Sequence, residues 1–133
     1  MTNKIERLID ANFNRLREAL RLLEDIQRYI FDNSELSYQF KDLRHKLTPL
    51  FNINRLQYRD IEGDVAKTSS KDELKRASIE DLINANFSRA LESARVLEEA
   101  FKLTNTKHSQ IAKEIRYTLY ALQKKVILNL QKD

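Results

Sequence analysis

The stretch LIDANFNRLREALRLLED at residues 8–25 occurs again as LINANFSRALESARVLEE at residues 82–99. At an offset of 74 positions, ten of the 18 aligned residues are identical. The identical pairs are Leu8/Leu82, Ile9/Ile83, Ala11/Ala85, Asn12/Asn86, Phe13/Phe87, Arg15/Arg89, Glu18/Glu92, Arg21/Arg95, Leu23/Leu97 and Glu24/Glu98. Shared Asn, Arg and Glu positions are harder to reach by helical composition alone than shared leucines, so the pattern indicates one unit that occurs twice.

A second echo, KDLRHKL at 41–47 and KEIRYTL at 113–119, follows at an offset of 72. Each half is therefore predicted to be a hairpin of two long helices. We expect an all-α fold, an antiparallel helical bundle built from two duplicated long-helix hairpins with pseudo-twofold symmetry. It forms one domain over residues 1–133, with repeat one at about 3–57, a connecting loop at about 58–71 and repeat two at about 72–131.

Apolar residues recur at steps of three and four along both halves, as on the buried face of a helix. Gly63 and Pro49 are the only glycine and proline, which excludes turn-dense β architectures. Ser34 and Ser78 are predicted to cap the second and third helices. Pro49 is predicted to kink the second helix, or to restart it with Thr48 as the new cap.

Composition excludes several classes of protein. Cysteine is absent, so there is no disulfide framework or cysteine-ligated metal. No apolar stretch approaches the roughly 20 residues that cross a bilayer, and the N-terminus lacks a signal-peptide pattern, so we expect a cytoplasmic protein without membrane contact. The net charge of +4 is dispersed among acids, which disfavours nucleic-acid binding. No Walker A or Rossmann glycine motif is present.

Asn12 and Asn86 each occupy a position of the apolar stripe where Leu or Ile is expected. A buried amide without partners costs about 1–3 kcal/mol, so two equivalent ones need an explanation. One is that they pair across the pseudo-twofold axis and fix helix register. The other is that both line a pocket and hydrogen-bond a ligand.

Arg15 and Arg89 lie three residues after the asparagines, and Glu18 and Glu92 three residues further. Arg beside Glu on one helix is usually a surface ion pair. An arginine at the boundary of the core can also hold a phosphate through two hydrogen bonds. Both interpretations remain open at this point.

The acids Asp60, Glu62 and Asp64 alternate around the single glycine, with Arg59 and Lys67 on either side. Carboxylates in such a segment suit Mg²⁺, which takes one or two carboxylates together with water and phosphate. A solvated linker between the hairpins explains the same composition.

The motifs ANFNRLREALRLLED, LRHKL, YRDIEGDV and RASIEDLINANFSRALESARVLEE, in this order, resemble one family over roughly residues 5–125. It is the small helical hydroxymethylpyrimidine phosphate kinases, a domain often fused N-terminal to thiamin phosphate synthase. The resemblance implies ATP- and Mg²⁺-dependent phosphorylation of 4-amino-5-hydroxymethyl-2-methylpyrimidine phosphate to its diphosphate in thiamin biosynthesis. No synthase domain follows Asp133, so we expect a stand-alone version or an excised domain.

The resemblance also implies roles for the residues above. Substrate binding falls to Asn12, Asn86, Arg15, Arg89 and Glu92. Nucleotide binding falls to Arg59, Gly63, Lys67 and Arg44, and Mg²⁺ binding to Asp60, Glu62 and Asp64. One acid among Asp64, Asp60 and Glu18 is predicted to orient the acceptor hydroxyl.

Two other interpretations stay open. A non-catalytic helical module that binds a pyrimidine phosphate and partners thiamin phosphate synthase would need the asparagines and arginines but not the loop acids. A helical scaffold would use the asparagines for register only. A homodimer that completes the site is compatible with the modest core of two hairpins.

Overall fold

The computed structural model describes residues 1–71 and 74–132, and in these ranges every regular element is helical. The all-α prediction is therefore confirmed. The long helices are α1 (Thr2–Asp25), α2 (Ser34–His45), α3 (Ile79–Phe101) and α4 (Thr106–Gln131). The short elements are a π-helical turn η1 (Ile26–Ile30) and the 3₁₀ segments η2 (Thr48–Leu50) and η3 (Ile53–Tyr58).

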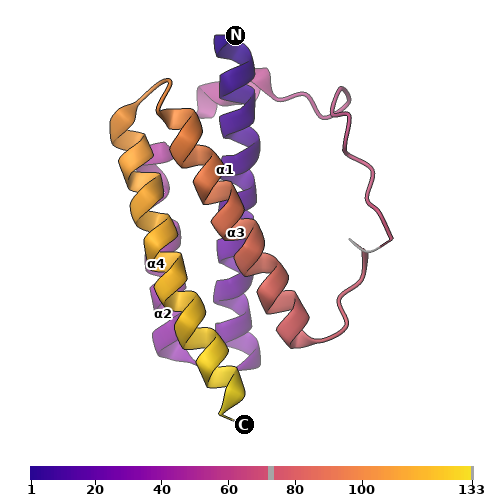
Figure 1. Ribbon diagram of the computed structural model, residues 1–133, viewed down its shortest axis with the longest axis vertical. Helices are drawn as coiled ribbons and strands as arrows, with labels where there is room; N and C mark the ends of the chain where they lie inside the picture. The colour runs from indigo at the N-terminus through magenta and orange to yellow at the C-terminus, as the bar shows by residue number, and fades with distance from the viewer. Residues whose placement is uncertain (72–73, 133) are drawn as a thin grey trace.

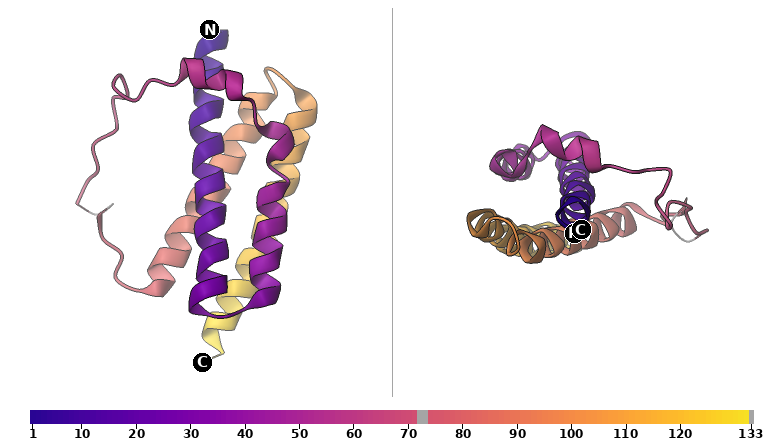
Figure 2. Two further views of the ribbon diagram at one scale, coloured as in Figure 1. Left: turned by 180° about the vertical axis from the view of Figure 1, so that it is seen from behind. Right: turned by 90° about the horizontal axis from the view of Figure 1, so that it is seen from above.

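The helices form two antiparallel hairpins, α1 with α2 and α3 with α4, which pack on each other as two layers (Figures 1 and 2). α1 makes its most extensive contacts with α3, while α2 and α4 touch less. The two chain ends lie at opposite ends of the bundle (Figure 1). Two hairpins are thus present, and their origin by duplication stays a prediction from the sequence.

The core lies between the two layers and is filled by the apolar stripes of all four long helices. Phe40 of α2 and Phe87 of α3 pack with ring centroids 5.9 Å apart, which joins the hairpins at their centre. Leu16, Leu20 and Leu97 are also fully buried. Burying a side chain of this size stabilises the fold by about 1.5–3 kcal/mol, so the stripe read from the sequence accounts for the packing.

One predicted cap is confirmed and two are wrong. Ser78 caps α3, and its hydroxyl accepts from the backbone N–H of Asp81 at 3.1 Å. α2 is capped by Asn33 rather than Ser34, because the extended residue 33 aims its amide oxygen at the N–H of Leu36. α2 ends at His45, and Thr48 is the first residue of η2 rather than its cap.

An ion pair, buried in one hairpin and partly buried in the other, ties the two helices of each hairpin together. Glu24 of α1 accepts from Arg44 of α2, and Glu98 of α3 accepts from Arg116 of α4, both at 2.9 Å. These pairs occupy matching positions of the two repeats. Hydrogen-bonded pairing is what makes a buried charge tolerable, so the four residues are part of the hairpin structure.

After η3 the chain leaves the bundle in a wide loop that returns to the start of α3 (Figure 1). Two contacts fasten the beginning of this loop to α1. The Arg59 guanidinium donates to both carboxylate oxygens of Asp10, at 2.8 and 2.9 Å. Arg7 donates to the backbone oxygen of Asp60 at 3.0 Å. The loop therefore starts against the N-terminal half of α1.

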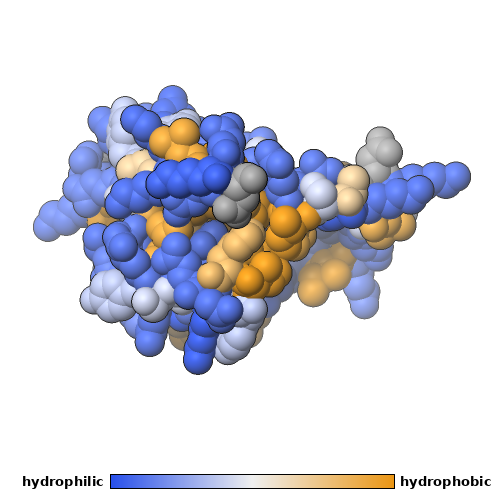
Figure 3. All heavy atoms as spheres, turned by 90° about the horizontal axis from the view of Figure 1, so that it is seen from below, coloured by the Kyte–Doolittle hydropathy of each residue, from blue (hydrophilic) through white to orange (hydrophobic). Residues whose placement is uncertain are grey.

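The lower end of the bundle shows hydrophilic residues with hydrophobic ones between them (Figure 3). Ile30 and Phe31 are exposed in the connection from α1 to α2. In the described part of the chain, no helix combines the length and the apolar character that crossing a membrane requires.

Candidate active site

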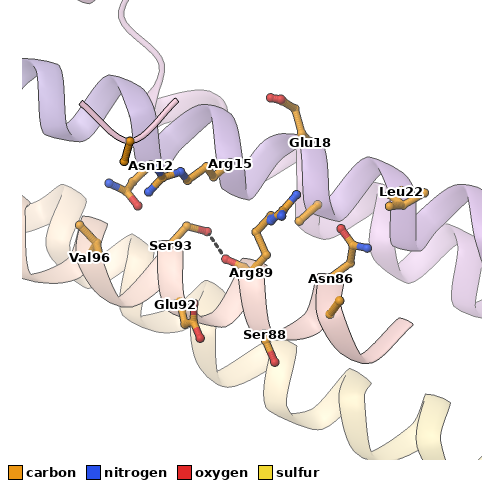
Figure 4. Close-up of a pocket in the computed structure, with 13 residues that line it drawn as sticks. Asn12, Arg15, Glu18, Leu22, Asn86, Ser88, Arg89, Glu92, Ser93 and Val96 are labelled. Atoms are coloured by element: carbon orange, nitrogen blue, oxygen red, sulfur yellow. Dashed lines mark hydrogen bonds between the residues drawn. The ribbon is translucent and has the colours of Figure 1, made fainter. Parts of the chain in front are cut away.

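A cavity of about 670 Å³ lies between α1 and α3 (Figure 4). Volumes of 300–1,000 Å³ are typical of small-molecule sites. The cavity is lined mainly by polar residues from the quoted repeats, with Ala66 of the loop at its edge. Six of the predicted site residues meet here, namely Asn12, Arg15, Glu18, Asn86, Arg89 and Glu92.

Most of the lining is made of residues that correspond between the repeats. Five pairs, each 74 positions apart, contribute: Asn12/Asn86, Arg15/Arg89, Glu18/Glu92, Ala19/Ser93 and Leu22/Val96. Because α1 and α3 run antiparallel, the two sets point in opposite directions along the cavity. Asn12 lies across from Val96 at one end, and Asn86 lies near Leu22 at the other (Figure 4). The cavity therefore has two ends built from matching residues.

The two asparagines do not pair with each other. The Asn12 side chain donates to the Leu8 carbonyl at 3.0 Å, and that of Asn86 donates to the Leu82 carbonyl at 2.8 Å. Each amide is thus anchored to its own helix, one turn back, and the predicted pairing across the axis is not formed. The side-chain oxygens take no part in these bonds, which leaves an acceptor at each end of the cavity.

Arg15 and Arg89 are exposed and turn into the space between the helices (Figure 4). Neither makes an ion pair with any acid among the described residues. The expected surface pairs with Glu18 and Glu92 are therefore not formed, and those carboxylates lie on the outer sides of the two helices (Figure 4). Among the described residues, the cavity thus holds two arginines that form no ion pair, although Glu18 and Glu92 also belong to its lining.

The arginines that support the fold behave differently. Arg44, Arg55, Arg59 and Arg116 each bind an acid, and these acids are Glu24, Glu6, Asp10 and Glu98, respectively. Arg55, within η3, also donates to the Leu50 carbonyl and lies over the Phe101 ring. The arginines that support the fold are thus each paired with an acid, whereas Arg15 and Arg89 form no such pair among the described residues.

A second cavity, also of about 670 Å³, adjoins the first on the loop side of α1. The two cavities share Asn12, Arg15 and Glu18. The second adds charged residues of α1 and the loop: Lys4, Arg7, Asp10, Arg59, Asp60 and Asp64. Hydrogen bonding to Asp10, ahead of the nearby charge of Glu18, raises the pKa of Arg59, so this side chain stays cationic.

The loop acids do not gather as a group of three. Asp60 and Asp64 line the second cavity, and each uses one carboxylate oxygen to accept from a loop amide, Gly63 N at 2.7 Å and Ala66 N at 3.0 Å. Glu62 lines neither cavity. Over the described residues, no three His, Asp or Glu side chains come close enough to share a metal ion. Two acids of the predicted metal set therefore line one cavity, and the third does not.

Three residues predicted to bind nucleotide also lie outside both cavities. Arg44 is committed to Glu24 between α1 and α2. Lys67 is exposed, with its ammonium 3.5 Å from the Glu62 carbonyl oxygen. A Cβ at position 63 would collide with the Asp60 carboxylate, so Gly63 allows that side chain to fold over the loop. The glycine therefore shapes the loop, and its predicted contact with a nucleotide stays a prediction.

Sequence reasoning missed Lys4, Arg7 and Asp10. Arg7 and Asp10 carry no repeat signal, because their counterparts at an offset of 74 are Asp81 and Asn84. Glu24/Glu98 and Arg44/Arg116 were detectable, since both partners of each ion pair recur. When an acid recurs beside buried leucines and an arginine recurs on the following helix, the pattern predicts an ion pair inside each hairpin.

Comparison with known proteins places this arrangement in a family. The chain matches the ThiD2 family over residues 7–125. It belongs to that family. It is 38% identical over 120 residues to a protein named thiamine-phosphate synthase from Synechocystis sp. (strain ATCC 27184 / PCC 6803 / Kazusa), covering 90% of this chain and 35% of the relative. A protein of the same name from Thermosynechococcus vestitus (strain NIES-2133 / IAM M-273 / BP-1) is 35% identical over 127 residues, with 95% and 36% covered.

This member of the ThiD2 family spans about a third of the length of the curated relatives it matches. The matched region contains most of both repeats and the whole loop, and it includes every residue of the two cavities from Arg7 onward. No solved structure matches the chain.

Proposed function

We propose that this chain is a kinase of thiamin biosynthesis. In the proposed reaction it transfers the γ-phosphoryl group of ATP to 4-amino-5-hydroxymethyl-2-methylpyrimidine phosphate and forms the diphosphate. Membership of the ThiD2 family and the names of its relatives support the pathway. The observation that carries the activity is the cavity lined by Arg15 and Arg89, one from each repeat, neither of which forms an ion pair among the described residues.

The chemistry of this transfer explains why two such arginines are needed. The hydroxyl of the pyrimidine already carries a phosphate, so the acceptor is a phosphate oxygen. A bond forms between that oxygen and the γ-phosphorus, the bond from the γ-phosphorus to the bridging oxygen breaks, and ADP leaves with the electron pair. Both reactants are anions, and their repulsion is the main obstacle to contact. Fixed cations between them lower it, as in other phosphoryl transfers.

This chemistry also corrects the role predicted for an acid. A phosphate group has its second pKa near about 6, so at neutral pH its oxygen reacts without losing a proton to the protein. An acid that orients a hydroxyl is therefore unnecessary, and Asp60, Asp64 or Glu18 has no proton to accept. We assign the loop acids to Mg²⁺ instead.

The donor set of the second cavity fits Mg²⁺. Asp60 and Asp64 each keep one carboxylate oxygen that binds no loop amide, and both side chains are exposed. Mg²⁺ is typically held by one or two carboxylates, with waters and phosphate oxygens completing its shell. When bound, the ion would neutralise charge on the nucleotide phosphates. Arg7 and Arg59 hold the start of the loop in place for this role.

The amide groups suit the pyrimidine ring. Its exocyclic amine donates hydrogen bonds, and the side-chain oxygens of Asn12 and Asn86 are acceptors held rigidly by their bonds to the preceding turn. Both residues are buried, so little conformational entropy is lost when a ligand binds.

The deciding experiment is to incubate the purified chain with Mg-ATP and either the pyrimidine phosphate or the unphosphorylated pyrimidine, and to follow products by ³¹P NMR. Diphosphate formed from the phosphate only is the expected result. The variants Asp60→Asn and Asp64→Asn should each lower turnover at least tenfold while the helical circular dichroism is unchanged. Glu62→Gln, in the same loop but outside the cavity, should retain turnover. Unchanged turnover in both aspartate variants contradicts the assignment of Mg²⁺ to the loop.

A second candidate is a non-catalytic module that binds the pyrimidine phosphate for a thiamin phosphate synthase. It is favoured by one observation: the chain aligns with only about a third of relatives that are named for the synthase. Pyrimidine phosphate that binds tightly without any magnesium-dependent consumption of ATP would make this module the better account.

A further inference from the structure

The two ends of the cavity between α1 and α3 match in sequence but differ in the charged residues around them. At one end, Asn86 and Arg89 stand with no second cation of the described chain in the lining. At the other, Asn12 and Arg15 open into the adjoining cavity. That cavity adds Lys4 and Arg7, which form no ion pair among the described residues, the paired Arg59 and Asp10, and the acids Asp60 and Asp64. We call these the Asn86 end and the loop end.

From this difference we infer that the two ends bind different ligands: the Asn86 end takes the pyrimidine monophosphate, and the loop end takes the polyphosphate of the nucleotide. The assignment rests on the proposed kinase function and adds to it which repeat holds which reactant. It is argued from charge, from the position of the loop acids and from the apolar wall of the cavity.

Charge is the first argument. A nucleoside triphosphate carries several negative charges along an extended chain, whereas the pyrimidine phosphate carries at most two. Lys4, Arg7 and Arg15, which form no ion pair among the described residues, suit the longer anion. A single arginine that binds through two hydrogen bonds suits the shorter one. Arg89 is such a single arginine, exposed toward the cavity and without an acid partner in the described chain.

The loop acids give the second argument. Asp60 and Asp64 reach only the loop end, because Arg59 and Arg7 fasten that part of the loop to the N-terminal half of α1. Mg²⁺ travels with the nucleotide and binds its phosphate oxygens, so the carboxylates that hold it belong beside the polyphosphate. Next to a monophosphate without a metal, the same carboxylates would only repel.

The apolar wall gives the third argument. Where α1 faces the Asn86 end it presents Leu22, with Ala19 also in the lining, while α3 contributes Ser93 and Val96 at the corresponding positions of the loop end. Leu22 and Ala19 offer an apolar surface for a methyl-substituted ring, and the Asn86 amide oxygen offers an acceptor for its amine. The Asn86 end therefore offers an apolar surface for the ring, a hydrogen-bond acceptor for the amine and an arginine for the phosphate.

The matching residues provide variants that control for each other. Arg15→Gln and Arg89→Gln remove the same group from equivalent positions, and neither side chain supports an ion pair in the described chain. Both variants should therefore fold as the wild type does, which circular dichroism and thermal unfolding verify. Isothermal titration calorimetry then measures the binding of two probes separately and without Mg²⁺, namely the pyrimidine phosphate and ADP.

Arg89→Gln is expected to weaken the pyrimidine phosphate at least tenfold and to change ADP affinity less than twofold. Arg15→Gln is expected to do the opposite. The reversed pattern overturns the assignment of ends, and so does an equal loss of both ligands in both variants. Either of these results leaves the kinase proposal standing if the ³¹P assay on the wild type shows diphosphate. A wild type that binds neither probe and forms no product overturns the kinase function and this assignment together.

Discussion

Replacing Asn12 and Asn86 by leucine tests whether these residues bind a ligand or only set the register of the helices. Each asparagine side chain is at most 4% exposed and donates one hydrogen bond to a carbonyl of its own helix. That bond is worth about 0.5–1.5 kcal/mol net. The carbonyl is not orphaned when the amide is removed, because in a regular helix it still accepts from the backbone N–H four residues on.

A buried leucine side chain gains about 1.5–3 kcal/mol from burial, which exceeds the lost hydrogen bond. The cavity beside each position provides room for its methyl groups. We therefore expect the free energy of unfolding to rise by about 1 kcal/mol per site, and the melting temperature by about 4 °C for a chain of this size. Affinity for the pyrimidine phosphate should fall at least tenfold in the double variant, since the Asn86 acceptor for its amine is gone.

Urea unfolding followed by circular dichroism measures the first effect, and calorimetric titration the second. Asn84→Leu is the matched control, because Asn84 lies on the exposed face of α3 and lines neither site cavity. It should alter stability by less than about 0.5 kcal/mol and leave binding unchanged. A double variant that is less stable than the wild type, or that binds the ligand with wild-type affinity, refutes the reasoning.

Two further changes test the structure that supports the site. Glu98→Gln should lower the free energy of unfolding by about 3 kcal/mol, because it leaves Arg116 charged and almost buried without its acid; Glu99→Gln, on the surface, should cost less than about 0.5 kcal/mol in the same urea titration. Burial, with the charge of Arg55 adding to it, lowers the pKa of His108 below its ordinary 6.5. The folded state thus binds this proton less readily than the unfolded chain, so stability is complete above pH 6.5 and falls as the pH drops toward the lowered pKa. Melting temperatures from pH 7.5 to 5.5 should decline less steeply for His108→Gln than for the wild type, and parallel curves would contradict the shift.

The sequence predicted the helices well because each buries a stripe of regular period. Ser78 was identified as a cap because its hydroxyl sits three residues before an acid, the usual spacing at a helix start. Ser34 failed because two good capping residues stand side by side, and composition does not say which one adopts the extended backbone. η3 was not predicted because tertiary contacts stabilise it: Arg55 donates to Glu6 and to the Leu50 carbonyl.

Site residues that recur in both repeats were predictable from the sequence. Site residues whose positions depend only on tertiary contacts were not. Asn12, Asn86, Arg15 and Arg89 stood out as polar identities within an apolar stripe, and the structure brings all four to one cavity. The loop was harder, since spacing along the chain does not determine which carboxylates face inward. Asp60 and Asp64 face a cavity because Arg7 and Arg59 fix the loop on α1, and these contacts span about 50 residues of sequence.

Two repeats alone produce a cavity with two equal ends, and equal ends suit two copies of one ligand. A transfer between two different phosphates requires the ends to differ. In this chain the difference comes from the segment that joins the hairpins, because a single connection fastened beside Asp10 can reach only one end of the cavity. In the proposed assignment, its acids and the cations of α1 beneath it would make one of two matching ends a site for a metal-bearing polyphosphate. The other end keeps the plain set of an amide, an arginine and an apolar wall.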